Sequence, residues 1–115
     1  MDVAYLGEKQ FRGEVAATGE VWVARGVHNN IYAEELDQTG LSLPVWSTRE
    51  RVVDYLKNAR PVGTKYEPHA VPFEMIAVTW LSDMSKGISE LQINPDGKTT
   101  RVLVLTADEF RALQG

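Results

Sequence analysis

Apolar residues recur along this chain with two different spacings, and each spacing predicts one kind of element. From Pro72 onward they return every three or four residues, which is the period of a helix with one buried face. Proline is favoured in a first helical turn and Gly87 is a suitable stop, so a helix is predicted between them. Its inward face comprises Phe73, Ile76, Ala77, Trp80, Leu81 and Met84.

A weaker helical pattern lies near the N-terminus. Leu6, Phe11 and Val15 form the inward stripe of a helix predicted over residues 6–18. Gly13 lowers the stability of this helix by about 1 kcal/mol relative to alanine. Gly19 ends it, as a glycine after the last helical turn does.

Short runs rich in β-branched and aromatic residues predict strands. In the first, residues 20–25, side chains on both faces are apolar, so we expect the strand to be covered on two sides. Pro44 has no N–H to donate and therefore belongs at a sheet edge or a strand end. The other predicted strands span residues 31–36 and 41–46, and residues 64–71 form a brief extended segment.

The strand at residues 41–46 turns abruptly into a helical pattern. The sequence Ser47-Thr-Arg-Glu50 is typical of a capping box, in which the Ser47 hydroxyl accepts from the Glu50 N–H and the Glu50 carboxylate accepts from the Ser47 N–H. We expect a helix from Thr48 to about Asn58. Its inward stripe consists of Val52, Val53 and Leu56.

The last third of the chain reads as a β-hairpin followed by a short helix. Within residues 90–105, Asn94-Pro-Asp-Gly97 suits a type I turn with glycine in the left-handed conformation. Residues 102–105 are apolar on both faces, which predicts a central strand. A second capping box begins at Thr106 and opens a helix with Phe110 and Leu113 inward.

These elements predict an α+β fold in one domain, residues 1–115. We expect a single mostly antiparallel sheet of about four to five strands with three to four helices packed against it. The composition, 43% hydrophobic and 24% charged, is that of an ordinary globular protein. A chain of this length buries enough surface for one core without disulfides.

Charge and cysteine content narrow the class of protein. The formal net charge of −4 argues against a general nucleic-acid binder, which needs a basic surface. No apolar run approaches the ~20 residues needed to span a bilayer, and the N-terminus lacks the features of a secretory signal. The absence of cysteine excludes thiolate chemistry and fits a cytoplasmic protein.

One local basic segment, residues 48–65, indicates either a solvated helix face or a surface for an anionic partner.

No arrangement of residues points to catalysis, a metal or a cofactor. His28 lies in a turn and His69 between two prolines, and neither has a ligand partner at helical spacing. Glu34 and Glu35 are neighbours that point to opposite faces of an extended segment, so they cannot converge on one pocket. No serine has a nucleophile elbow around it. We therefore expect no enzyme and no cofactor.

Aromatic residues are the remaining candidates for a binding site. Trp46 belongs in the core or, if partly exposed, anchors a ligand pocket or a subunit interface, where tryptophan is enriched. Trp22 and Tyr55 are grouped with it. Arg49 and Arg51 lie two residues apart on a helix, so only one of them faces such a site, and Arg49 in the first turn is the predicted one.

Several short motifs resemble a small bacterial family of unknown function, the domain numbered twenty-seven fifty. They are the strand Glu20-Val-Trp-Val, the segment Leu43-Pro-Val-Trp-Ser-Thr-Arg-Glu-Arg-Val, Phe73 with Trp80-Leu81, and the approach to Asn94-Pro95. The resemblance covers roughly residues 20–95 and implies a small cytoplasmic bacterial α+β protein, with no catalytic residues to carry over. The longer acidic turn around Glu34 and Glu35 departs from the family pattern and leaves the register of the second strand open. The strand–helix corner is also similar, more distantly, to the N-terminal domain of SseB-type secretion-associated proteins.

The preferred hypothesis is a non-enzymatic cytoplasmic interaction module that self-associates through a groove or sheet edge near Trp46 and the basic helix. Its partners would be further copies of itself, another protein or a small ligand, without nucleic acid or membrane. The alternative is a domain that binds a small molecule or anion in an aromatic-lined pocket between helix and sheet, floored by Trp22, Trp46 and Trp80.

Overall fold

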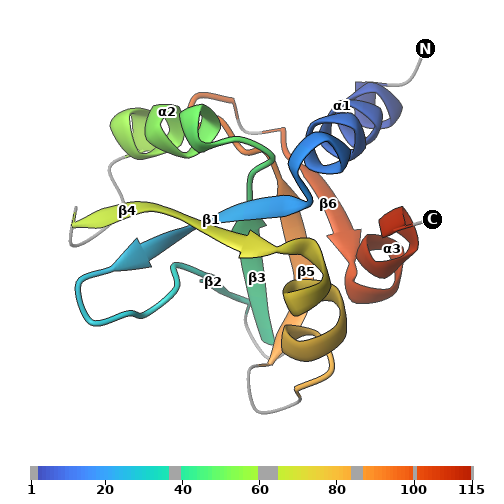
Figure 1. The fold of residues 1–115 in the computed structure, drawn as a ribbon. Coiled ribbons are helices and arrows are strands. Elements are labelled where there is room, and N and C mark those ends of the chain that lie inside the picture. Colours follow the sequence, from blue (N-terminus) through green and yellow to red (C-terminus); the bar gives the residue numbers. More distant parts are fainter. Residues whose placement is uncertain (1–2, 37–39, 60–64, 84–86, 100, 115) are drawn as a thin grey trace.

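The computed structural model describes residues 3–36, 40–59, 65–83, 87–99 and 101–114 and has an α+β fold (Figure 1). The helical elements are α1 (Val3–Thr18), α2 (Arg49–Ala59), the π-helix η1 (Met75–Trp80), α3 (Ala107–Arg111) and the 3-10 helix η3 (Ala112–Gln114). The strands are β1 (Glu20–Gly26), β2 (Glu34–Leu36), β3 (Gly40–Val45), β4 (Tyr66–Pro72), β5 (Ile88–Ile93) and β6 (Leu103–Thr106).

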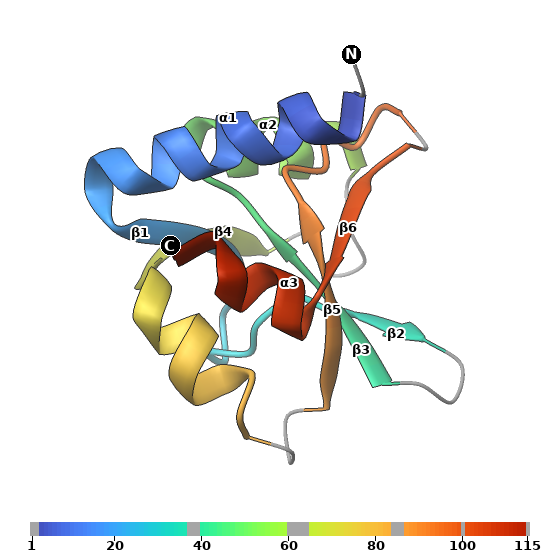
Figure 2. The same ribbon diagram turned by 90° about the vertical axis from the view of Figure 1, so that its right-hand side faces the viewer.

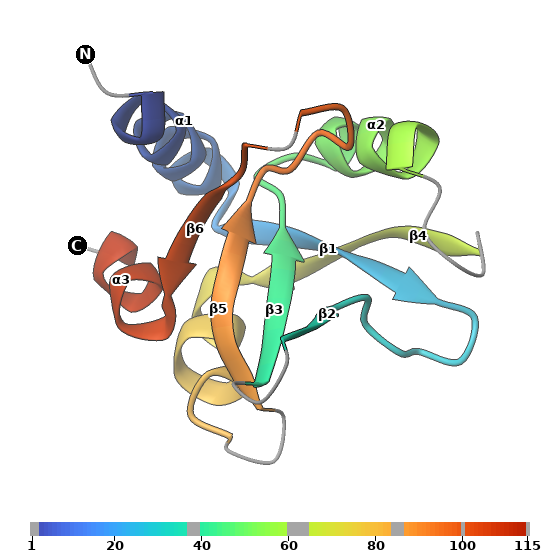
Figure 3. The ribbon, with the colours of Figure 1, turned by 180° about the vertical axis from the view of Figure 1, so that it is seen from behind.

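The strands form two sheets, so the expected single sheet is wrong. β1 and β4 pair antiparallel over their whole length, and a separate mixed sheet has the order β2-β3-β5-β6 with β3 and β5 parallel. The two sheets meet where Trp22 and Trp46 exchange both backbone hydrogen bonds, at 2.7 and 2.8 Å. This contact is only one residue pair long, so β1 crosses β3 instead of running along it (Figure 3). The continuous ladder of β1 is the one that it forms with β4.

The position of β6 also corrects a prediction. The apolar run at residues 102–105 was expected at the centre of a sheet, but β6 ends the four-stranded sheet and has a strand neighbour, β5, on one side only. Leu103 and Leu105 face the core, whereas Val104 points outward and is 43% exposed. β6 therefore has apolar residues on both of its faces, although only one of these faces is buried.

The region around Pro72 differs from the expected helix start. Pro72 is the last residue of β4, because Val71 pairs with Val21 and the Phe73 N–H donates to the Gly19 carbonyl at 2.9 Å. The helical segment begins only at Phe73, and the Leu81 N–H bonds to the Ile76 carbonyl five residues back, the π-helical pattern. The segment is therefore shorter than predicted, while its inward face is confirmed for the described residues: Phe73, Ile76 and Ala77 are buried, and Trp80 and Leu81 pack on the core. Met84 lies outside the described residues.

Other local predictions are confirmed. Pro44 lies next to last in β3, beyond the β2 ladder, which ends at Ser42, so its missing N–H interrupts no pairing with β2. Gly97 has the expected left-handed conformation, with a φ of +76°, although β5 and β6 are joined by a longer connection than the predicted tight turn. Thr106 forms the expected capping box with Glu109 at the start of α3.

The core consists of two clusters of side chains. α1 and α3 lie on the same side of the four-stranded sheet and enclose the larger cluster with η1 (Figure 2). The smaller cluster lies between β1, the end of β3 and α2, and contains Ala24, Trp46, Val52 and Tyr55. As predicted, β1 is covered on two faces, since Val21 and Val23 belong to the larger cluster and Ala24 to the smaller.

Candidate functional site

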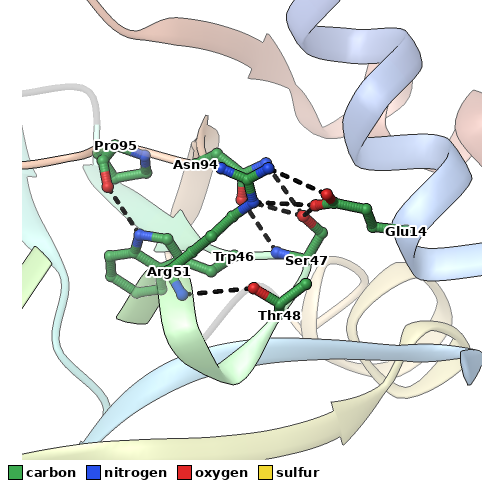
Figure 4. A network of polar contacts seen from close by, with 7 residues as sticks. All are labelled: Glu14, Trp46, Ser47, Thr48, Arg51, Asn94 and Pro95. Atoms are coloured by element: carbon green, nitrogen blue, oxygen red, sulfur yellow. Dashed lines mark hydrogen bonds and ion pairs between the residues drawn. The ribbon is translucent and has the colours of Figure 1, made fainter. Parts of the chain in front are cut away.

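The polar residues at the strand–helix corner form one connected network (Figure 4). Arg51 on α2 holds the Glu14 carboxylate of α1 with two nearly parallel bonds, Nε to Oε1 at 2.9 Å and Nη2 to Oε2 at 3.0 Å. Such a bidentate arrangement fixes direction as well as distance. Glu14 and Arg51 lie 37 positions apart in the sequence, so the pair joins two helices that are distant along the chain.

Ser47 and Asn94 complete the network (Figure 4). The Ser47 hydroxyl donates to Glu14 Oε1 and accepts from Asn94 Nδ2 at 3.0 Å, while the Ser47 N–H donates to Asn94 Oδ1 at 2.9 Å. Asn94 has a φ of +50°, a conformation that asparagine tolerates better than most residues. The network therefore connects α1, the β3–α2 corner and the end of β5.

The predicted capping box at Ser47 is wrong. The Thr48 hydroxyl, one residue later, accepts from the Arg51 N–H at 3.3 Å and caps α2. The bonds of Ser47 go to Glu14 and Asn94 instead, which are far away in sequence. Ser47 therefore makes tertiary hydrogen bonds in place of the helix cap that the local sequence pattern predicted.

The chemistry of this network suits a structural role. The hydrogen bonds from Arg51 hold the pKa of Glu14 below its ordinary value, against the effect of partial burial and with help from the Ser47 hydroxyl. A carboxylate with a lowered pKa is a poor general base at neutral pH. Ser47 is only 2% exposed, so its hydroxyl is also closed to a substrate.

Trp46 lies in the core. Its side chain is 0% exposed, and the indole N–H donates to the Pro95 carbonyl at 2.8 Å (Figure 4). The anchoring role depended on partial exposure, and that condition is not met. Trp46 instead positions the loop after β5 against the start of α2.

The other predicted binding residues are only partly brought together. Tyr55 is 6% exposed and its ring lies 5.0 Å from that of Trp46, and half-buried Trp22 packs on the same cluster. Arg49 is exposed, whereas Arg51 is the arginine of the pair that turns inward to a partner. Three of the four residues thus form a core cluster rather than a surface.

The three tryptophans expected to floor one pocket lie in two clusters, with Trp80 on the larger and Trp22 and Trp46 on the smaller. Trp80 borders a hollow of about 270 Å³ beside β3 and β5, and Tyr55 borders one of about 420 Å³ between α2 and the β5–β6 connection. A hollow of about 440 Å³ lies beside α1. Its walls are Phe11, Arg12, Val15, Ala16, Gly19, Pro72, Phe73, Glu74 and Leu113.

The free sheet edges are the second kind of candidate site. β4 is the free edge of the two-stranded sheet, because the outer side of β1 bonds to Trp46, Tyr32 and Asn30, and β2 and β6 end the other sheet. Unpaired edge groups are a template for another strand, so the residues on these edges determine whether a second chain can pair there.

His28 is exposed in the turn after β1, and half-buried His69 pairs with Val23 across the β1–β4 ladder. Within the described ranges, no three acidic or imidazole side chains gather as a metal site. The helices found there include none with the length and apolar character to cross a bilayer.

Together, the fold and the corner network define a small α+β domain whose buried polar residues hold its elements in place. The chain belongs to the family described as a protein of unknown function, DUF2750, whose model matches residues 9–113. This confirms the family suggested by the short motifs of the sequence. No curated protein matches the chain at a significant level.

Sequence reasoning missed Glu14 and Asn94 as members of the network. Glu14 lies 33 residues before Ser47 and Asn94 lies 47 residues after it, so no local spacing relates the three. The signal that was present is Asn94 itself, since asparagine tolerates the positive φ that it adopts here.

Proposed function

We propose that this chain is a non-enzymatic domain that self-associates, with two copies pairing through the free edge of β6. The observation that carries the proposal is that β6 lacks the features that protect the other free edges of the described sheets. The absence of enzymatic activity is supported by the buried Ser47 and by the engagement of Glu14 with Arg51. The lack of cysteine favours a cytoplasmic location.

Prolines protect the edge of β4. Trp22 directs its backbone groups to Trp46, so Ala70, which faces Trp22 across the ladder, directs its own to the outer edge. The alternation puts the backbone of Pro68 and Pro72 on that edge as well, and neither has an N–H to offer. A strand pairing with β4 would therefore lose two of its hydrogen bonds.

Charge and length protect the edge of β2. This strand has three residues, and two of them are the exposed Glu34 and Glu35. Two copies pairing there in antiparallel fashion would set a carboxylate of one copy opposite a carboxylate of the other on each face, which is unfavourable. Short, charged edge strands are a common means of preventing sheet extension.

β6 has neither form of protection within the strand itself, although the Glu109 carboxylate of the α3 capping box already accepts the Thr106 N–H at its end. Its residues Leu103–Thr106 include no proline and no charged side chain, and Val104 presents an exposed apolar surface beside the edge. A two-fold axis next to β6 would pair two identical strands antiparallel, and this arrangement closes after two copies. Val104 of each copy would then lie against the other copy and lose its contact with water.

Sedimentation velocity over a wide range of concentrations tests the proposal. We expect a dimer that grows with concentration in the unmodified chain, and a monomer in Val104→Lys, because a lysine on an edge strand opposes pairing. Val27→Lys is the matched control, since Val27 is 67% exposed in a turn and should leave the dimer intact.

Two results would contradict pairing through β6. One is a monomer at every concentration in the unmodified chain. The other is a dimer that survives in Val104→Lys but dissociates in Val78→Lys, which would place the interface on η1, where Val78 is 60% exposed.

A further inference from the structure

The hollow beside α1 has the dimensions of a ligand site. Its volume of about 440 Å³ lies within the range of small-molecule pockets, roughly 300–1,000 Å³. It is bordered by α1, by the β4–η1 junction and by Leu113 in the C-terminal 3-10 helix. These segments come from both ends and the middle of the chain.

The floor of this hollow is apolar and firmly held. Phe11 and Phe73 line it, and both rings rest on Phe110, with Phe73 stacked at 4.9 Å and Phe11 tilted at 6.2 Å. Phe110 is itself 0% exposed, so the two lining rings have little freedom to move. A rigid aromatic floor favours an apolar group and costs little conformational entropy on binding.

The wall on the α1 side provides a positive charge. Arg12 lines the hollow and forms no ion pair or hydrogen bond with another described residue, whereas Arg25, Arg51 and Arg111 each hold a carboxylate. Glu74 on the other wall already takes part in an interaction within the chain. An anionic group would therefore be drawn toward Arg12 and away from Glu74.

We infer that this hollow binds a small amphipathic carboxylate, with its apolar body against Ala16, Pro72 and Leu113 above the nearly buried ring of Phe73, and with its carboxylate on Arg12. The planar guanidinium presents paired N–H groups that match the two oxygens of a carboxylate. Ala16 has a small side chain and Gly19 has none, which leaves room at the border of the hollow for the apolar body to enter. This inference concerns a different surface from β6 and does not depend on self-association.

Phenylpropionate is a suitable probe, with phenylpropanol and phenylpropylamine as its neutral and cationic counterparts. Ligand-detected NMR and isothermal titration should show binding of the carboxylate, with the alcohol and the amine weaker by about tenfold, the loss expected for one charge-assisted hydrogen bond. Arg12→Gln should reduce the affinity for the carboxylate to that for the alcohol and leave the affinity for the alcohol unchanged.

A pair of tryptophan variants tests the location. Ala16→Trp fills the hollow and should abolish binding of all three probes, whereas Ala17→Trp adds the same side chain at an exposed position outside the lining and should not. Val104→Lys should bind phenylpropionate as the unmodified chain does, which separates this site from the proposed interface. The inference is wrong if phenylpropionate does not bind, if Arg12→Gln does not weaken it, or if Ala16→Trp and Ala17→Trp bind it equally.

Discussion

Arg51 and Glu14 are joined by two hydrogen bonds that also form an ion pair between α2 and α1. α1 packs on the larger core cluster through Phe11 and Val15, whereas α2 packs on the smaller one, so the pair links helices that belong to different clusters. Each side chain is only about one third exposed, at 30% and 33%. The pair is therefore better shielded from solvent than an ordinary surface salt bridge, whose contribution is near zero to 1 kcal/mol.

The pKa of Glu14 makes part of the stability dependent on pH. Because Arg51 lowers this pKa in the folded state, the contribution is present above the unfolded-state pKa of Glu14 and is lost as the pH falls through the folded-state value. We expect Glu14→Gln to reduce the free energy of unfolding at pH 7 by about 1–2 kcal/mol, allowing for partial solvent screening. Urea denaturation at neutral and acidic pH should show a smaller loss on acidification in this variant.

Glu8→Gln is the matched control for that experiment, since Glu8 lies on the same helix and takes no part in the network. It should follow the unmodified chain at both pH values. An equal acid-induced loss in Glu14→Gln and the unmodified chain would show that the pair contributes nothing to the pH dependence.

Ser47 and Thr48 are neighbouring hydroxyl residues with different structural roles, and alanine substitutions can distinguish these roles. Thr48→Ala removes the α2 cap and should cost about 1 kcal/mol. Ser47→Ala leaves the half-buried amide of Asn94 short of a partner and should cost about 1–3 kcal/mol.

A double-mutant cycle with Glu14→Gln distinguishes the two roles further. Ser47 and Glu14 share a hydrogen bond, so Ser47→Ala and Glu14→Gln should not be additive. We expect a coupling energy within the range of roughly 0.5–3 kcal/mol that is usual for residues in one network. Thr48→Ala and Glu14→Gln should couple more weakly, because Thr48 contacts only the backbone N–H of Arg51 and not its side chain. Coupling of Thr48 as strong as that of Ser47 would contradict the division of roles.

Trp46→Phe tests the core assignment of the residue first considered as an anchor. The variant loses the bond to the Pro95 carbonyl and leaves unfilled volume, so we expect a loss of about 2–4 kcal/mol in unfolding free energy. Sedimentation of the folded variant should show the same association as the unmodified chain. A change in association without a change in stability would restore Trp46 as an interface residue.

Predictions from local sequence succeeded where the deciding contacts are local. The capping box at Thr106 and the positive φ of Gly97 each depend on residues within a few positions, and both are confirmed. The inward face of η1 was also visible, because the side chains that pack together lie a few residues apart.

The failures arise where a distant partner competes with the local preference. Ser47 has a donor to cap within its own segment, the Glu50 N–H, yet its bonds go to Glu14 and Asn94. Pro72 suits a first helical turn, but the pairing of β4 with β1 extends the strand through it. The candidate interface and the hollow at Arg12 were missed for the same reason, since strand order and the approach of α1 to Phe73 are tertiary facts.

Gly40 and Gly19 provide a last test, because they share a positive φ but differ in their surroundings. Gly40 has a φ of +108°, and a Cβ there would lie 2.5 Å from the Gly87 carbonyl oxygen and closer still to Ser89 Oγ. Gly19 has a φ of +74° and open space where its Cβ would be. Gly19→Ala should therefore cost only the backbone strain, about 1–2 kcal/mol.

Gly40→Ala should cost clearly more than Gly19→Ala, because the methyl group must displace the backbone that accepts the Leu41 N–H at 2.7 Å. That hydrogen bond joins the start of β3 to the residue just before β5, so the parallel pairing of the two strands begins there. Urea denaturation of the two variants measures the difference, and hydrogen exchange of β3 and β5 should quicken only in Gly40→Ala. Equal losses in the two variants would mean that the close approach at Gly40 relaxes without cost to the sheet.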